Sequence, residues 1–112
     1  MDALWTKITE VRGRDERRSS APDPAMELLL ISKMSEESNE AGELYRRLHG
    51  WGTDGHITAT LPEVQDEVCA AILAGMVALD RISPSGTAGE HWNRYLTYGY
   101  ERALAENTRV QT

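Results

Sequence analysis

The sequence predicts an all-α protein, a four-helix bundle, and three observations support this fold class. Helix-forming residues dominate the 112-residue chain, which has no Phe and lacks the alternating apolar–polar runs of half-buried strands. Helix start signals and Gly or Pro stop signals divide the chain into four segments. In the two middle segments, apolar residues recur at helical spacing. The length suits one compact domain.

The first helix is expected from about Asp2 to Val11. Residues 13–24 then have the composition of a mobile connector, because Pro22 and Pro24 exclude a helix from its end. We therefore divide the chain into a short N-terminal helix with its connector (1–23), the helical domain (24–107) and a C-terminal tail (108–112).

The second helix has a start signal at Asp23-Pro24, with Asp as N-cap and Pro at the first helical position. It should continue to about His49 and end at Gly50. The third helix is expected to begin with a capping box and to end before a proline. The fourth helix is expected to begin with a similar capping box. These signals are Thr60-Leu61-Pro62-Glu63, Ser83-Pro84 and Thr87-Ala88-Gly89-Glu90, after which the fourth helix covers 91–106.

Composition excludes several classes of protein. The formal charge of −6 argues against a nucleic-acid-binding domain, which would carry a basic face. The single cysteine, Cys69, excludes an internal disulfide framework and a cysteine-rich zinc site. The longest uncharged apolar run, 68–79, is shorter than the roughly 20 residues of a membrane span, and the N-terminus lacks an apolar signal segment. We therefore expect a cytoplasmic protein without membrane or nucleic-acid partners.

The second helix has an apolar stripe that contains a carboxylate. At about 100° per residue, Glu37 falls about 40° from the stripe centre at Ala41, and Glu40 falls at its edge. Burying an unpaired carboxylate is unfavourable, and like charges at i,i+3 and i,i+4 repel one another. Only Lys33, one turn earlier, offers local compensation. The alternative interpretation is a solvated acidic face, which is the commoner role of such clusters.

The third helix has an apolar stripe with Glu67 at its border. The helix is apolar nearly all round, which indicates burial on several sides. Four helices of one small chain can hardly enclose it, so we expect a homodimer or homotetramer with this helix near the interface. The stripe comprises Leu61, Val64, Val68, Ile72, Gly75, Leu79 and Ile82.

Inward-facing carboxylates on two packed helices are a common way to build a divalent-metal site in a bundle. Oxygen ligands without His or Cys favour Mg²⁺, or Mn²⁺. Because Mg²⁺ held by carboxylates normally keeps open positions for water and phosphate, the pattern indicates phosphate chemistry on a nucleotide or pyrophosphate.

Two segments together resemble the MazG-like family of all-α nucleoside triphosphate pyrophosphohydrolases. They are K33-M-S-E36-E37-S-N-E40 and, after a Gly-rich loop, D66-E67-V-C-A70-A-I-L-A-G-M-V-A-L79. The resemblance covers about 28–82, and the family signature is E-E-x-x-E on one helix and E-x-x-D on the next.

The resemblance implies that Glu37 and Glu40 are metal ligands and catalytic residues, with Glu36 in a supporting role at the metal. Glu67 would begin the second motif as a further ligand. The family aspartate expected three residues later is Ala70 here. Compensation could come from Asp66 or Glu63, from an alternative register Glu63-x-x-Asp66, or from a site with one metal or none.

The resemblance further implies that water attacks the α-phosphorus of a nucleoside triphosphate, which yields the monophosphate and pyrophosphate. Lys33, Arg47 and Arg94 are candidates to bind the phosphates, and Trp51, Tyr45 or Trp92 to stack on the base. Two alternatives stay open. One is a catalytically degenerate family member that acts as a nucleotide-binding or interaction module, which Ala70 favours. The other is a bundle that only mediates assembly.

Overall fold

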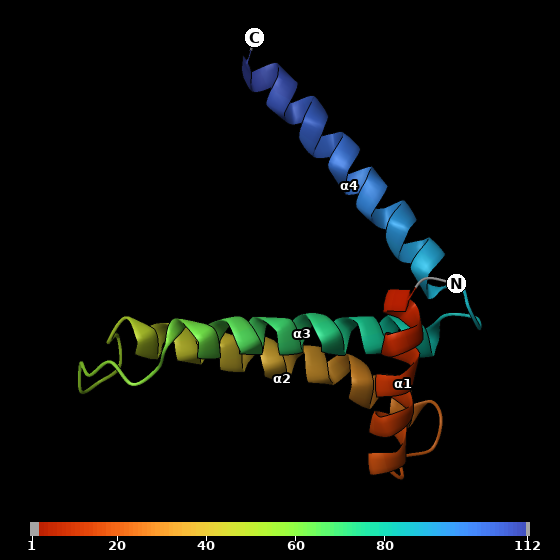
Figure 1. The fold of residues 1–112 in the computed structure, drawn as a ribbon, viewed down its shortest axis with the longest axis horizontal. Coiled ribbons are helices and arrows are strands. Elements are labelled where there is room, and N and C mark those ends of the chain that lie inside the picture. Colours follow the sequence, from red (N-terminus) through yellow and green to blue (C-terminus); the bar gives the residue numbers. More distant parts are fainter. Residues whose placement is uncertain (1–2, 112) are drawn as a thin grey trace.

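The computed structural model describes residues 3–111, apart from the side chain at 111, and contains four helices and no strand within this range. The all-α prediction is therefore confirmed. In chain order the helices are α1 (Ala3–Arg18), α2 (Ala25–Leu48), α3 (Leu61–Ile82) and α4 (Ala88–Gln111). Figure 1 shows α2 and α3 as an antiparallel hairpin, α1 across one end of it, and α4 extending away from that end.

Small side chains line the contact between α2 and α3. Ala41 of α2 and Ala74 and Ala78 of α3 are buried. At Gly75 an added Cβ would lie 3.4 Å from the Met34 side chain, so the two helices pass close together at this level. A contact of small residues lets the backbones approach and brings flanking side chains of the two helices within reach of each other.

The hydrophobic core lies where α1 crosses the hairpin. Trp5 and Ile8 of α1 pack there with residues of the other helices, and Val77 of α3 is only 1% exposed. Ala88, the first residue of α4, is also buried in this cluster. The core is therefore at one end of the hairpin, and the other end has little apolar cover. The remaining buried members of the core are Met26, Leu30 and Ala78.

The first helix is longer than predicted. Its expected start at Asp2 lies outside the described residues, but it continues past Val11 to Arg18, so the prediction of a connector from residue 13 is wrong. Ion pairs with α3 explain the difference. Arg12 Nε lies 3.2 Å from Asp80 Oδ2, and Arg81 pairs with Glu16. These partners are distant in sequence, so local composition does not reveal them.

The expected N-cap of α2 is also wrong. The helix begins at Ala25 after Pro24, without a side-chain cap, because the Asp23 carboxylate pairs with Arg81 of α3. Its C-terminal end agrees with the prediction, since His49 is the C-cap. Gly50 follows with φ of 69°, and a Cβ there would lie 2.8 Å from the Gly55 carbonyl oxygen. Glycine is therefore needed at this position.

Both predicted ends of α3 are confirmed. Thr60 is the N-cap, and its hydroxyl accepts a hydrogen bond of 3.4 Å from the Glu63 backbone N–H. In return the Glu63 carboxylate accepts one of 3.0 Å from the Thr60 backbone N–H, which completes the capping box. The helix ends at Ile82, with Ser83 as C-cap.

The fourth helix begins at Ala88 and continues beyond the predicted 106 to Gln111, so it includes most of the expected tail; Thr112 lies outside the described residues. The predicted capping box at its start is wrong, because the Thr87 hydroxyl donates to the Pro84 carbonyl oxygen at 2.6 Å and the Thr87 backbone N–H donates to the same oxygen at 3.0 Å. From residue 93 to 110 every side chain is exposed, and the helix leaves the rest of the molecule (Figure 1).

The predicted apolar stripe of α3 is only partly covered in the single chain. Val64 is buried, whereas Leu61, Val68, Ile72 and Ile82 are about half exposed. The buried face of α3 is instead centred on Ala74, Val77 and Ala78. Within the described range, no helix combines the length and apolar character needed to cross a membrane.

We expect Gly89→Ala to destabilise the fold by about 1–3 kcal/mol, since a Cβ at this position would lie 2.9 Å from Trp5 Cδ1 in the core. Urea denaturation followed by circular dichroism measures the effect. The matched control is Gly42→Ala in α2, where the nearest atom to a Cβ is the flexible Arg46 side chain at 4.0 Å. That variant should be stabilised by up to about 1 kcal/mol. Equal effects of both variants would contradict the tight contact at Gly89.

Candidate metal centre

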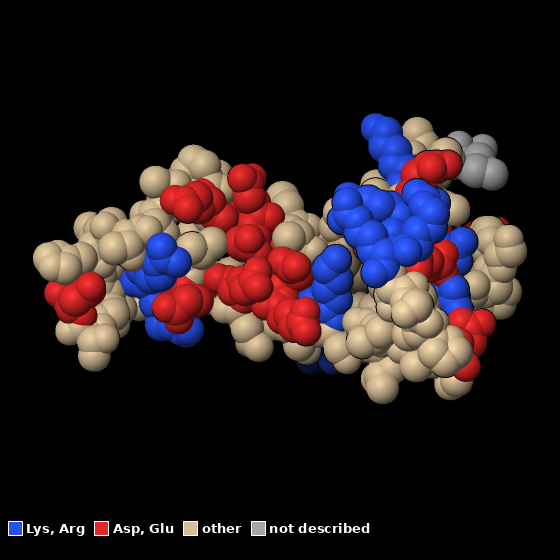
Figure 2. All heavy atoms as spheres, turned by 90° about the horizontal axis from the view of Figure 1, so that it is seen from below, with Lys and Arg blue, Asp and Glu red and all other residues tan. Residues whose placement is uncertain are grey.

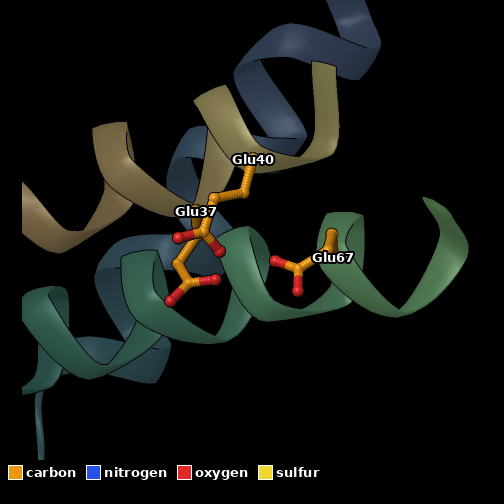
Figure 3. Close-up of side chains that lie close together, drawn as sticks. All are labelled: Glu37, Glu40 and Glu67. Carbon is orange, nitrogen blue, oxygen red and sulfur yellow. The ribbon is translucent and has the colours of Figure 1, made fainter. Parts of the chain in front are cut away.

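Three glutamates from two helices converge midway along the hairpin. Glu37 and Glu40 project from α2 and Glu67 projects from α3 toward them (Figure 3). One carboxylate oxygen from each residue lies within 4.8 Å of the others. Glu37 and Glu67 are half-buried, and Glu40 is exposed. The structure therefore brings together three of the four predicted metal ligands.

The arrangement concentrates negative charge at Glu67. Its contact with the Glu37 carboxyl group raises the pKa of Glu67 most, and burial and the charges of Glu40 and Glu37 raise it further. Two carboxyl groups can share a hydrogen bond only if one of them holds a proton. Glu67 Oε2 is moreover buried without a hydrogen-bond partner. The site therefore favours a proton or another cation.

A divalent cation fits this set of donors. Three carboxylates provide only hard oxygen ligands, which suit Mg²⁺ or Mn²⁺. The buried and unpartnered Glu67 Oε2 is an acceptor that lacks compensation from the protein. Glu37, Glu40 and Glu67 would hold the ion.

The other acidic residues near the motif lie outside this group. Glu36 is exposed, and the structure does not bring it to the other three carboxylates. Asp66 is also exposed, and Glu63 is engaged in the capping box with Thr60. Ala70, half-buried one turn after Glu67, offers no oxygen. None of the considered replacements for the family aspartate therefore joins the three carboxylates.

Arg47 is the predicted phosphate-binding residue that shares a hollow with the acids. It borders, with Glu40 and Glu67, a shallow hollow of about 250 Å³. Its guanidinium group donates hydrogen bonds of 2.9 Å to the hydroxyl and the carbonyl oxygen of Thr58. These bonds hold the side chain between the loop and the acidic residues.

Lys33 lies one turn before Glu37 and faces α1, where its Nζ is 3.9 Å from Asp15 Oδ2. Figure 2 shows basic side chains gathered over the end of α1, beside the acidic group. Arg14, Arg17 and Arg18 are exposed at this end. Within residues 3–111 neither Arg17 nor Arg18 has an ion-pair partner. The basic group cannot be predicted while these arginines are assigned to a connector, whereas a helix that continues through them places them together at its end.

Three predicted substrate contacts lie outside the acidic group. Trp51, 64% exposed, is in the loop at the far end of the hairpin, where its ring stacks on His49 at a centroid distance of 4.8 Å. Tyr45 contacts both rings edge-on, which makes an aromatic group at this end. Arg94 is exposed on α4, which diverges from the hairpin, so the single chain does not bring it to the acidic residues (Figure 1).

Comparisons with protein-family models, with curated proteins and with solved structures find no match for this chain. The resemblance to the MazG-like family therefore depends on the two acidic motifs and on their placement.

In the absence of metal, we expect Glu67 to make stability depend on pH. Because its pKa is raised in the folded state, the native protein binds this proton more tightly than the unfolded chain does. This contribution is complete at and below the ordinary carboxylate pKa, and is lost as the pH rises through the raised value.

Thermal denaturation between pH 4 and 7 in chelator tests this prediction. Glu67→Gln should be more stable than wild type at pH 7, and the difference should shrink toward pH 4. The control is Asp66→Asn, an exposed neighbour on the same helix. If both variants differ from wild type by the same amount at every pH, the raised pKa is contradicted.

Proposed function

We propose that the protein is a divalent-metal-dependent nucleoside triphosphate pyrophosphohydrolase of the MazG-like type. The observation that carries this proposal is the convergence of Glu37, Glu40 and Glu67 from facing helices, with their oxygens within 4.8 Å of one another. The signature motif anticipates the same residues, and helical periodicity singles out Glu37 and Glu40 independently. The motif and the helical periodicity thus point to the same site.

In the proposed reaction, the oxygen of a water molecule forms a bond to the α-phosphorus of the nucleotide. The bond from this phosphorus to the bridging oxygen breaks, and pyrophosphate leaves. Glu37 or Glu40 accepts a hydrogen bond from the attacking water, orients it and takes up its proton. Glu67, whose pKa is raised by its neighbours, lies where a cation would be retained. A bound Mg²⁺ or Mn²⁺ would neutralise phosphate oxygens and lower the pKa of water.

Positive side chains on either side of the acidic group are the proposed phosphate contacts. Arg47 borders the hollow beside Glu40. On the other side are Lys33 and the basic group at the end of α1, in which Arg17 and Arg18 are exposed. Arginine suits this role because its planar guanidinium group can donate two parallel hydrogen bonds to a phosphate. Trp51 is the proposed stacking partner for the base.

A second candidate is a catalytically degenerate member of the same family that binds nucleotides without hydrolysis. Ala70 favours this function, since the expected fourth carboxylate is absent and neither Asp66 nor Glu63 joins the other three. The three remaining carboxylates have enough negative charge to attract a cation. The position of that cation would be fixed by one ligand fewer than in the family motif. Restoration of the carboxylate distinguishes the two functions.

We further propose that the protein is a homo-oligomer. The chain exposes 8274 Å², whereas a compact folded chain of 12.5 kDa exposes about 6,200 Å². Its radius of gyration, 17.7 Å, also exceeds the roughly 13 Å of a compact domain of this length. The excess area is close to what one subunit buries in an obligate homodimer.

Metal binding should appear as thermal stabilisation. Free Mg²⁺ or Mn²⁺ at about a hundred times its dissociation constant should stabilise the wild type by about 2.7 kcal/mol. Glu37→Gln should abolish this stabilisation, because it removes a ligand from the centre of the group. The matched control is Glu43→Gln on the same helix, whose carboxylate pairs with Arg46 at 2.9 Å. An equal loss in both variants, or no stabilisation of wild type, would contradict the metal centre.

The enzymatic activity is tested by release of pyrophosphate from a mixture of nucleoside and deoxynucleoside triphosphates, with Mg²⁺ and with Mn²⁺. We expect metal-dependent release that falls at least about a hundredfold in Glu37→Gln, since loss of a group that fixes a metal commonly has effects of this size. Ala70→Asp should increase the rate. Release by Ala70→Asp but not by wild type would favour the degenerate function, and no release by either would contradict the proposed reaction.

A further inference from the structure

Two large apolar surfaces of the chain have no cover. The first, which we call the hairpin face, has Ile31, Met34 and Tyr45 on α2, and Leu61, Val68 and Ile72 on α3; each is between 40% and 54% exposed. Within each helix these residues fall in a sector of roughly 60° or less at about 100° per residue. The proximity of Met34 to Gly75 joins the two sectors across the helix contact. The acidic residues lie on the opposite side of that contact.

The second surface is a stripe along α4. Beyond Trp92, which packs against the core, Leu96, Gly99 and Ala103 recur at three- and four-residue spacing, with Tyr95 and Tyr100 beside them. Leu96, Tyr95 and Tyr100 are 53–66% exposed. Most of the stability of a helix in a protein comes from packing of its apolar face, so a stripe that packs against nothing beyond the first turns of α4 indicates a partner surface.

The base of α4 directs the helix away from its own hairpin. Ala88 is buried in the core, and Gly89 lies so close to Trp5 that a Cβ would be 2.9 Å from the indole ring. This contact fixes the first turn of α4 against α1, and the rest of the helix points outward (Figure 1). To cover its own hairpin face, α4 would have to give up this packing.

We propose that α4 is an arm exchanged between two copies of this chain. In a two-fold dimer, the stripe of each α4 packs on the hairpin face of the other copy. The lengths agree, since α4 has 24 residues and α3 has 22, or about 36 and 33 Å of helix. One type of contact, made twice, covers both apolar surfaces. A dimer with hairpin faces packed against each other would leave α4 bare.

The area supports a second copy as the occupant. The excess of about 2,000 Å² over a compact chain matches what one subunit of an obligate homodimer buries. Both surfaces belong to the same chain, so an exchanged pair is self-complementary and needs no other partner. The acidic residues stay open on the opposite side of the hairpin. The exchanged dimer therefore requires neither metal binding nor catalysis.

A complementation experiment with two charge variants tests the exchange. Ile72→Glu places a charge on the hairpin face, and Leu96→Glu places one on the arm. Each alone should raise the dimer dissociation constant at least about a hundredfold, because a carboxylate would be buried without a partner. In a 1:1 mixture, the intact arm of the Ile72→Glu chain meets the intact hairpin face of the Leu96→Glu chain, so dimers should reappear in sedimentation velocity.

The control is Ile57→Glu in the loop, 70% exposed and outside both surfaces, which should remain dimeric. Circular dichroism of each variant verifies that the helices are retained, and recovery in the mixture itself requires folded chains. An Ile72→Glu variant that stays dimeric would indicate arm-to-arm contacts and overturn the exchange, and two monomeric variants that do not recover on mixing would overturn it too. A monomeric wild type, or a Leu96→Glu variant that stays dimeric, would overturn it as well.

Discussion

The close packing of α2 against α3 is the constraint on which the rest of the structure depends. Ala41, Ala74 and Ala78 keep the contact narrow, and Gly75 accommodates the Met34 side chain. A narrow contact lets side chains that flank it on one helix reach those on the other. Glu67 thereby meets Glu37 and Glu40, although about thirty residues of chain separate the two motifs. A wider contact would leave three separate solvated carboxylates.

The same packing divides the hairpin into two unlike sides. One side carries the three carboxylates, with Arg47 and Lys33 near them. The other side is apolar and half exposed, and it provides the surface that an oligomer would cover. Charge and apolar area are thus separated by the helix contact, which explains how a single hairpin can offer both a hydrophilic site and an interface.

Within the described part of the chain, the three carboxylates of the acidic group lack a basic side chain that would compensate their charge at Glu67. A structural ion-pair network would have brought a basic side chain to Glu67, as α3 does at its other end, where Arg81 pairs with Glu16, Asp23 and Glu27. At Glu67 the nearest groups are instead two further carboxylates, and one of its oxygens is buried without a partner. The contrast within one helix supports the proposed cation-binding role of the three glutamates.

The sequence by itself determined the helical class, the capping box at Thr60 and Glu63, the stop at Gly50 and the inward position of Glu37. These depend on interactions within one turn or on the periodicity of one helix, which local residues specify. The full length of α1 and the lost cap at Asp23 could not be predicted in this way, because Arg81 and Asp80 of α3 supply the partners. Only the tertiary structure decided that Glu67 joins the α2 carboxylates while Asp66 and Glu63 do not, and that Arg94 lies apart from them. The physical reason is that meeting across a helix contact depends on how two helices are rotated and spaced, which packing along their whole length sets.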